Sequence, residues 1–272
     1  MSTRPAAVVT GAARGLGRAI AERLATSGHL VVGIDLDADE LKSSIPALPG
    51  EGHQWVGGDA GSVDVLTDAF DRIGESAALR TFVPNAGIAR PGDSLDFSMQ
   101  AWDALHHVLL KASFLGAREA VRRMPGGGSI VMIASINGQL GFAGRAAYGA
   151  AKAGVQGLVR SLAVEWAGRG VRVNAVSPGT VSTEMQQAFM KTSYASPERF
   201  LRHVPMNRFG RPEEVADAVE FSLPTAPRTS PARSCPSTAA GTRSGWPARS
   251  LPRDREARPR RCFVLSGLAL VC

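Results

Sequence analysis

Short apolar runs alternate with longer amphipathic segments along the first 221 residues of the chain. The runs are continuous, which predicts buried strands at 6–10, 30–35, 53–58, 80–84, 129–134 and 171–176. The segments between them repeat apolar positions at helical spacing, which predicts helices at 15–27, 62–74, 99–123, 146–167 and 212–221. This alternation predicts the α/β class, with a doubly wound parallel sheet inside three α/β/α layers. Residues 1–221 are therefore expected to form one domain, whose active site lies beyond the carboxyl ends of the strands.

A glycine-rich turn joins the first predicted strand to the first predicted helix. Its glycines, Gly11, Gly15 and Gly17, let the backbone turn tightly and approach a pyrophosphate held at the helix N-terminus. The spacing is G-x-x-x-G-x-G rather than the common G-x-G-x-x-G. The strand, turn and helix together predict a Rossmann-type dinucleotide site.

The acid that ends the second predicted strand bears on the choice of dinucleotide. Asp35 follows Gly17 by eighteen residues, where a carboxylate accepts the ribose hydroxyls of NAD and repels the 2′-phosphate of NADP. Arg14 weakly favours NADP instead, because its guanidinium is able to bind a phosphate. The sequence therefore favours NAD over NADP.

Three residues farther along predict proton chemistry at a C–O bond. Tyr148 and Lys152 are four apart on one helix face, and Ser135 lies thirteen residues before the tyrosine. A tyrosine pKa of about 10 is too high for catalysis near neutral pH, and a neighbouring cation lowers it. The phenol then exchanges a proton with a substrate oxygen that the serine also contacts. No metal is expected, because His106 and His107 have no partner at metal-ligand spacing.

Taken in order from Thr10 to about Phe221, these motifs resemble the short-chain dehydrogenase/reductase family. The resemblance adds Asp59 as an adenine contact, Asn85-Ala86-Gly87 as support for the central sheet, and the segment from Ser177 to Thr183 as the holder of the nicotinamide carboxamide. It implies Ser135, Tyr148 and Lys152 as the catalytic residues. The cofactor-binding residues that it implies are Gly11, Arg14, Gly15, Leu16, Gly17, Asp35, Asp59, Ala60, Asn85, Ala86, Gly87, Tyr148, Lys152, Pro178, Gly179, Val181 and Thr183.

The same resemblance implies an oxidoreductase that transfers hydride between NAD(P) and a small alcohol or ketone, a 3-oxoacyl thioester among the candidates. In the family, the stretch 183–208 is a flap over the substrate, and its apolar residues suggest an uncharged ligand. Pairing through the helices at 99–123 and 146–167 would make a homodimer or homotetramer.

One departure from the family motivates an alternative interpretation. Leu109 occupies the place of an asparagine that normally holds a water of the proton relay, and leucine cannot hold it. The alternative is a homologue that binds the cofactor but is catalytically impaired.

The tail 222–272 differs in composition from the rest of the chain. It holds nine Arg, no Lys and two acids, so its net charge of +7 equals that of the whole chain. Rich in Pro, Arg and Ser, it is expected to be largely disordered. Without interleaved aromatic residues it does not indicate nucleic-acid binding. The domain is therefore expected to lack the family's last strand.

We hypothesise that the chain after about Phe221 is a frameshifted reading of an ordinary family C-terminus. Members usually continue with a strand ending in Val-Asp-Gly-Gly. The residues from Pro224 onward are compatible with GC-rich codons that also encode a second sequence. When these codons are read in the frame that starts at the third base of the first codon, they translate as DRASYVTGSVLPVDGG. Nucleotide sequence without such a second frame would refute this.

Localisation is expected to be cytoplasmic without membrane contact. Met1 to Arg4 leads directly into a predicted strand, so no signal peptide is expected. Phe263 to Val271 is apolar but too short to span a bilayer.

Overall fold

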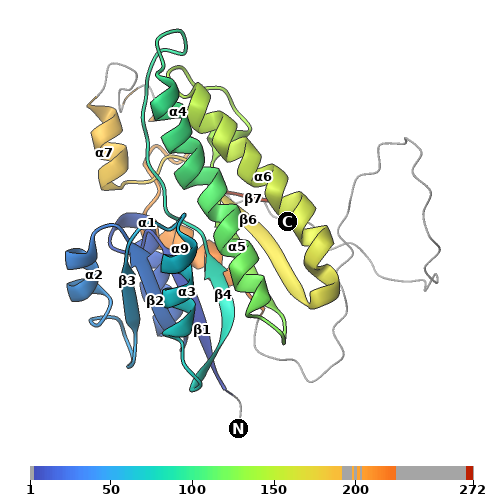
Figure 1. Cartoon of the computed structure of the whole chain (residues 1–272). Helices are drawn as coiled ribbons and strands as arrows, with labels where there is room; N and C mark the ends of the chain where they lie inside the picture. Colours follow the sequence, from blue (N-terminus) through green and yellow to red (C-terminus); the bar gives the residue numbers. More distant parts are fainter. Residues whose placement is uncertain (1–2, 192–197, 199–200, 203, 225–267, 272) are drawn as a thin grey trace, which may run out of the picture.

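A seven-stranded sheet forms the centre of the molecule (Figure 1). The structure is a computed structural model that describes residues 3–191, 198, 201–202, 204–224 and 268–271. The strand order is β3-β2-β1-β4-β5-β6-β7, and all pairs from β3 to β6 are parallel. The strands are β1 (Arg4–Thr10), β2 (Leu30–Asp35), β3 (Gln54–Gly57), β4 (Ala77–Val83), β5 (Gly128–Ile133), β6 (Val171–Pro178) and β7 (Leu268–Val271).

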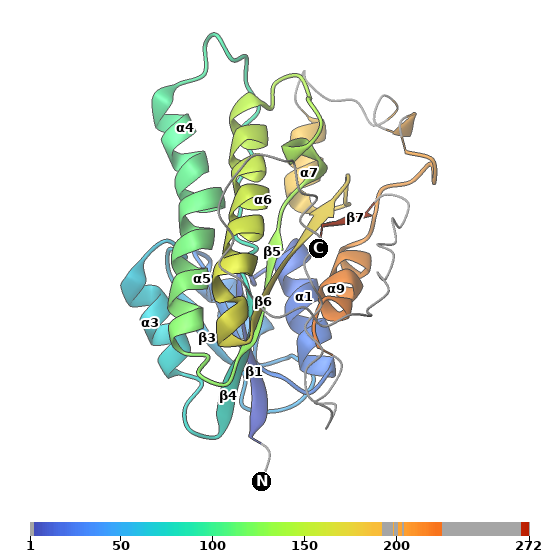
Figure 2. The same cartoon turned by 90° about the vertical axis from the view of Figure 1, so that its right-hand side faces the viewer.

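Helices cover both faces of this sheet (Figure 2). One layer contains α3 (Val63–Asp71), α4 (Met99–His106), α5 (Ala112–Arg122) and α6 (Ala146–Trp166). The other contains α1 (Gly15–Thr26) packed against α9 (Pro212–Phe221). Shorter elements complete the described chain: α2 (Ala38–Ser44), α7 (Glu184–Met190), the π-helical turn η1 (His107–Lys111), and the 3₁₀ turns η2 (Ile136–Gly138) and η3 (Ala167–Arg169).

Strand β1 shows why the strand runs are continuously apolar. Ala6 and Val8 belong to the core cluster under α3, α5 and α6, whereas Ala7 and Val9 belong to the cluster under α1 and α9. All four side chains are completely buried. A strand covered on both faces has no solvent side, so both sets of alternating positions are apolar.

The predicted α/β architecture is confirmed, with differences in three helical regions. Helix α7 lies in the stretch 183–208, where no helix was predicted. Helix α2 was not predicted, because it has only seven residues and follows β2 almost directly. The Asp37 side chain caps it by accepting the Glu40 N–H at 3.1 Å. The single helix predicted at 99–123 contains the π-helical turn η1 between α4 and α5, and Leu109 lies in that turn.

The edge of the sheet beside β6 carries β7, although the sequence predicts that the last strand is missing there. β7 is four residues long and antiparallel to β6, with Leu268 opposite Pro178 and Val271 opposite Ala175. Residues 225–267 and 272 lie outside the described residues, so disorder of the tail and the frameshift stay hypotheses. Within the described part of the chain, none of the helices is long and apolar enough to cross a membrane.

Candidate active site

The carboxyl ends of the parallel strands bring most of the predicted site residues into one cleft. The cleft measures about 1010 Å³ and is lined by the glycine turn, Asp35, Ser135, Tyr148, Lys152 and the segment after β6. Of the predicted set, Ala86, Asp59 and Ala60 do not line it. The Ala86 N–H instead donates to the Thr10 hydroxyl at 3.0 Å, which ties the end of β4 to the end of β1.

The glycine turn is too crowded for any other residue type at two positions. A Cβ on Gly17 would lie 1.8 Å from the carbonyl oxygen of Gly11, and Gly11 itself has φ +68°. The Asn85 amide fixes the turn by donating to the carbonyls of Thr10 at 3.0 Å and Gly11 at 3.2 Å. The first turn of α1 has no side-chain cap at Arg14, so its backbone N–H groups are left for an anionic ligand. This cradle fits a dinucleotide pyrophosphate.

A charged cluster lies where the adenosine ribose of such a dinucleotide would bind. Asp35 accepts the Ala13 N–H at 3.1 Å and the Asp37 N–H at 3.2 Å. The Arg14 guanidinium forms an ion pair with Asp37 and reaches Glu184 of α7 at 3.4 Å. Two carboxylates therefore surround Arg14, the cation that the sequence relates to a 2′-phosphate.

The three predicted catalytic side chains meet at the end of β5. Ser135 follows this strand, and its hydroxyl accepts the Asn137 N–H at 3.2 Å. Tyr148 and Lys152 come from successive turns of α6, and the Lys152 ammonium donates to the Ile133 carbonyl at 2.6 Å. Since β5 and α6 are both parts of the rigid core, the site is built on fixed elements.

Gln156 is a supporting residue that sequence reasoning missed. It is buried one turn after Lys152, and its amide donates to the Ser135 carbonyl at 3.1 Å and the Ser177 hydroxyl at 3.4 Å. It thereby links the catalytic serine loop to the segment after β6. The spacing of four from Lys152 was the available signal, because it places Gln156 on the same helix face.

The pKa values in the cleft differ from the simple expectation. Loss of hydration raises the pKa of Tyr148, while the nearby Arg145 cation and the Ser135 hydroxyl work to lower it. Burial lowers the pKa of Lys152 to about 8. Its ammonium lies 5.8 Å from the Tyr148 ring centroid and donates to the Ile133 carbonyl. The Arg145 guanidinium carbon lies 5.2 Å from the same centroid, so two cations flank the phenol.

The depressed pKa of Lys152 predicts a pH dependence of stability. Between the folded value of about 8 and the ordinary value of 10.5, the unfolded chain binds this proton and the folded chain does not. The free energy of unfolding should therefore rise with pH in that window, by about 3 kcal/mol from this group. Denaturant unfolding near pH 7.5 and near pH 10 measures it. Lys152→Met should lack this increment, and an equal rise in both proteins would contradict the assignment.

Leu109 makes an apolar floor beneath the cleft. Its side chain is 1% exposed and packs so closely on Gly87 that a Cβ there would lie 3.2 Å from the leucine. Its carbonyl accepts the Ser113 hydroxyl at 2.8 Å. The structure thus places no side-chain amide at the position where the family has asparagine.

Asp59 lies in the loop after β3 and bonds to His107, one of the two histidines without a partner at metal-ligand spacing. The Asp59 carboxylate is 2.8 Å from the His107 Nε2 and accepts the Gly61 N–H at 2.8 Å. Partial burial works to raise the pKa of Asp59, but these two partners outweigh it and hold the pKa below its ordinary value. The described residues contain no cluster of three or more metal-ligating side chains.

Comparison with known proteins agrees with this geometry. A family model described as Enoyl-(Acyl carrier protein) reductase matches residues 11–224. Carbonyl reductase family member 4 of Danio rerio is 39% identical over 221 residues, which cover 80% of this chain and 90% of the relative. Cis-4-hydroxycyclohexanecarboxylate dehydrogenase of Sinomonas cyclohexanicum is also 39% identical over 221 residues, covering 79% and 87%. The crystal structure of a putative gluconate dehydrogenase from Agrobacterium tumefaciens has a TM-score of 0.75 at 32% identity, covering 80% of this chain and 88% of that one.

The fold and the cleft define a Rossmann-type oxidoreductase that uses a nicotinamide cofactor. More narrowly, the chain belongs to the short-chain dehydrogenase/reductase family. The family match ends at residue 224, close to the start of the compositionally different tail.

Proposed function

We propose that this protein interconverts an alcohol and a carbonyl compound with a nicotinamide dinucleotide. The observation that carries the proposal is the placement of Ser135, Tyr148 and Lys152 in the same cleft as the glycine cradle. When bound, the dinucleotide supplies or accepts the hydride at its nicotinamide ring. The residues of the chain therefore have to position the substrate oxygen and move one proton to or from it.

The three side chains divide this task. In the reductive direction Tyr148 donates its phenolic proton to the substrate oxygen, and in the oxidative direction it accepts that proton. Ser135 hydrogen-bonds the same oxygen and orients it toward the phenol. Lys152 is proposed to hold the nicotinamide ribose, and binding there would shift its contacts from the Ile133 carbonyl.

The relatives support a carbonyl or alcohol substrate without fixing which one. They are named as a carbonyl reductase, as dehydrogenases and as 3-oxoacyl-[acyl-carrier-protein] reductases. They do not favour the alternative of an impaired homologue. Oxidation of NADH by the purified chain with a panel of ketones, 3-oxoacyl thioesters included, tests the proposal. Cofactor binding without turnover of any of them would overturn it.

We propose NAD as the preferred coenzyme, on the basis of Asp35 and of the ion pairs that hold Arg14. With Arg14 bound to Asp37 and Glu184, its guanidinium is not available to a 2′-phosphate, and Asp35 repels that group. Asp37→Ala should release the guanidinium and raise kcat/KM for NADPH by about 10- to 100-fold, the effect of one charge-assisted hydrogen bond.

The control is Asp39→Ala, which removes an exposed acid of the same helix. Asp39→Ala should leave the ratio of kcat/KM for NADH to kcat/KM for NADPH within about twofold of the original value, as is usual for surface substitutions. If this ratio is also unchanged in Asp37→Ala, the ion pair with Asp37 is not what keeps Arg14 from binding a 2′-phosphate.

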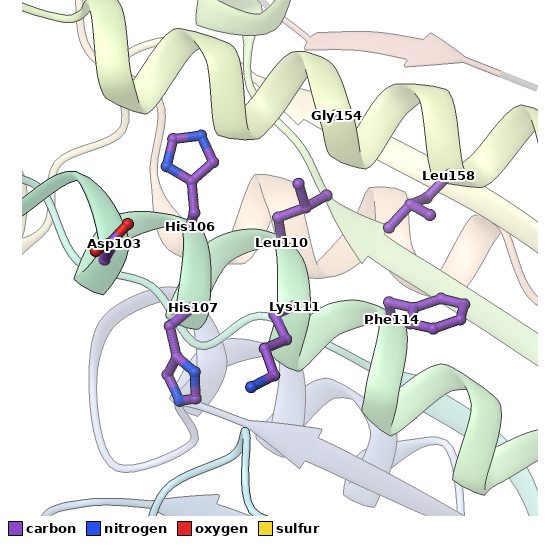
Figure 3. Close-up of a pocket in the computed structure, with 8 residues that line it drawn as sticks. All are labelled: Asp103, His106, His107, Leu110, Lys111, Phe114, Gly154 and Leu158. Carbon is purple, nitrogen blue, oxygen red and sulfur yellow. The ribbon is translucent and has the colours of Figure 1, made fainter. Parts of the chain in front are cut away.

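We propose further that the protein pairs through α4, α5 and α6. A groove on the outer side of these helices combines apolar and charged side chains (Figure 3). Leu110 and Phe114 approach Leu158 of α6 in this groove, while His107 and Lys111 point away from α6. Sedimentation of the purified chain should show a multiple of the 28.5 kDa subunit, and a monomer at all concentrations would contradict this proposal.

A further inference from the structure

Arg145 is a cation in the wall of the catalytic cleft, three residues before Tyr148. Its guanidinium carbon lies 3.6 Å from the ring centroid of Phe189 on α7 and 5.2 Å from that of Tyr148 on α6. Phe189 is only 4% exposed. The arginine is therefore held between the catalytic helix and the flap by cation–π contacts with these two rings.

These contacts leave the edge of the guanidinium, where its five N–H donors lie, for other partners. Among the described residues no carboxylate lies within ion-pair distance of Arg145. The acids of the cleft are engaged elsewhere, since Asp37 and Glu184 hold Arg14 and Asp35 accepts two backbone N–H groups.

The electrostatics of the cleft agree with an uncompensated charge. Burial lowers the pKa of Arg145, and the only group that acts in the opposite direction is Tyr148. A partly desolvated cation without an anionic partner costs free energy, which an incoming anion recovers. Arginine matches the two oxygens of a carboxylate particularly well, because its fork donates two parallel hydrogen bonds.

We infer that Arg145 binds a carboxylate of the substrate, so that the substrate class is oxo acids and the corresponding hydroxy acids. This inference rests on the proposed function, because it takes Tyr148 as the group beside the reacting oxygen. The guanidinium lies about one ring width from Tyr148, which places the carboxylate a few carbon atoms from the carbonyl. It also revises the expectation of an uncharged ligand, because Phe189 of the apolar flap turns a face to Arg145.

Matched pairs of ketones test the assignment. Purified chain and NADH are combined with 3-oxobutanoate, 4-oxopentanoate or 5-oxohexanoate, and separately with the methyl ester of each. Each turnover consumes one NADH and one proton and forms one alcohol. In at least one pair the acid should have a kcat/KM about tenfold or more above that of its ester, as expected for a charge-assisted contact.

Variants at position 145 separate the charge from the packing. Arg145→Gln should lower kcat/KM for the preferred acid by about 10- to 100-fold more than it lowers kcat/KM for the ester. The loss for the ester measures what the guanidinium does at the Tyr148 phenol, and the extra loss for the acid measures the carboxylate contact. For the acid, Arg145→Lys should have a kcat/KM between that of the original protein and that of Arg145→Gln. Lysine keeps the positive charge but cannot donate two parallel hydrogen bonds. Arg169→Gln, at an exposed site beyond the far end of α6, is the charge-matched control and should change neither.

Two results would overturn the inference. One is an original protein that prefers the esters in every pair. The other is an equal loss for acid and ester in Arg145→Gln, which would mean that Arg145 acts only through packing or on the Tyr148 phenol. If no ketone turns over, thermal unfolding of the NADH complex is measured with each acid and ester. A rise in Tm with an acid alone, lost in Arg145→Gln, would support the carboxylate site although the proposed reaction had failed. A complex whose Tm no acid raises would refute the site.

Discussion

Tyr148→Phe is expected to lower kcat by about 10²- to 10⁴-fold, the usual contribution of a positioned general acid–base group. The substitution removes one hydroxyl and leaves the ring, so the packing of the phenylalanine against Arg145 should be retained. Because the proposed mechanism assigns proton delivery to the phenol, kcat and kcat/KM should fall together while the affinity for NADH stays the same.

The matching measurements are steady-state kinetics for turnover and fluorescence titration for NADH affinity. Ser135→Ala serves as a second variant, since it removes the neighbouring hydroxyl without touching the proton donor. A Tyr148→Phe protein that keeps more than about a tenth of the original kcat would contradict the role given to the phenol.

Gly17→Ala is expected to remove dinucleotide binding and to destabilise the fold. The new Cβ would lie 1.8 Å from the Gly11 carbonyl oxygen and 2.6 Å from the Asn85 amide, so the backbone of the turn would have to move. Forced overpacking of this kind costs about 3 kcal/mol. The Tm should fall by roughly 6–12 °C, as expected for a chain of this size.

A second glycine provides the control for this prediction. Gly168 follows α6, and a Cβ there would meet nothing within 4 Å. Gly168→Ala should therefore preserve both the Tm and the affinity for NADH. Normal NADH binding by Gly17→Ala would show that the turn does not cradle the pyrophosphate.

The sequence predicted the sheet well because its strands are buried on both faces. Continuous runs such as β1 are distinct from the amphipathic helices between them, and the segments that follow β1, β2, β4, β5 and β6 line the cleft. Asp35, Ser135 and the glycine turn reach one site because parallel strands share a carboxyl edge. The topology thus brings together residues that are more than a hundred positions apart.

Other features depend on contacts that no periodicity carries. The π-helical turn around Leu109 interrupts a segment that has an ordinary helical pattern, and α2 is too short to show one. Nothing in the sequence singled out Arg145, because its contact with Phe189 depends on how α7 packs. The pairing of Arg14 with Asp37 and Glu184 joins three segments distant in sequence, so spacing could not reveal it.

Transfer of deuterium from NADH labelled at C4 to the product alcohol would demonstrate the proposed hydride transfer itself. The purified chain, NADH carrying deuterium on either face of C4, and the ketone panel are combined, and the alcohols are examined by mass spectrometry. One deuterium per alcohol is expected from one of the two labelled forms, and this label should be absent from the product of Tyr148→Phe. Binding of NADH without labelled alcohol from any ketone would contradict the proposed hydride transfer.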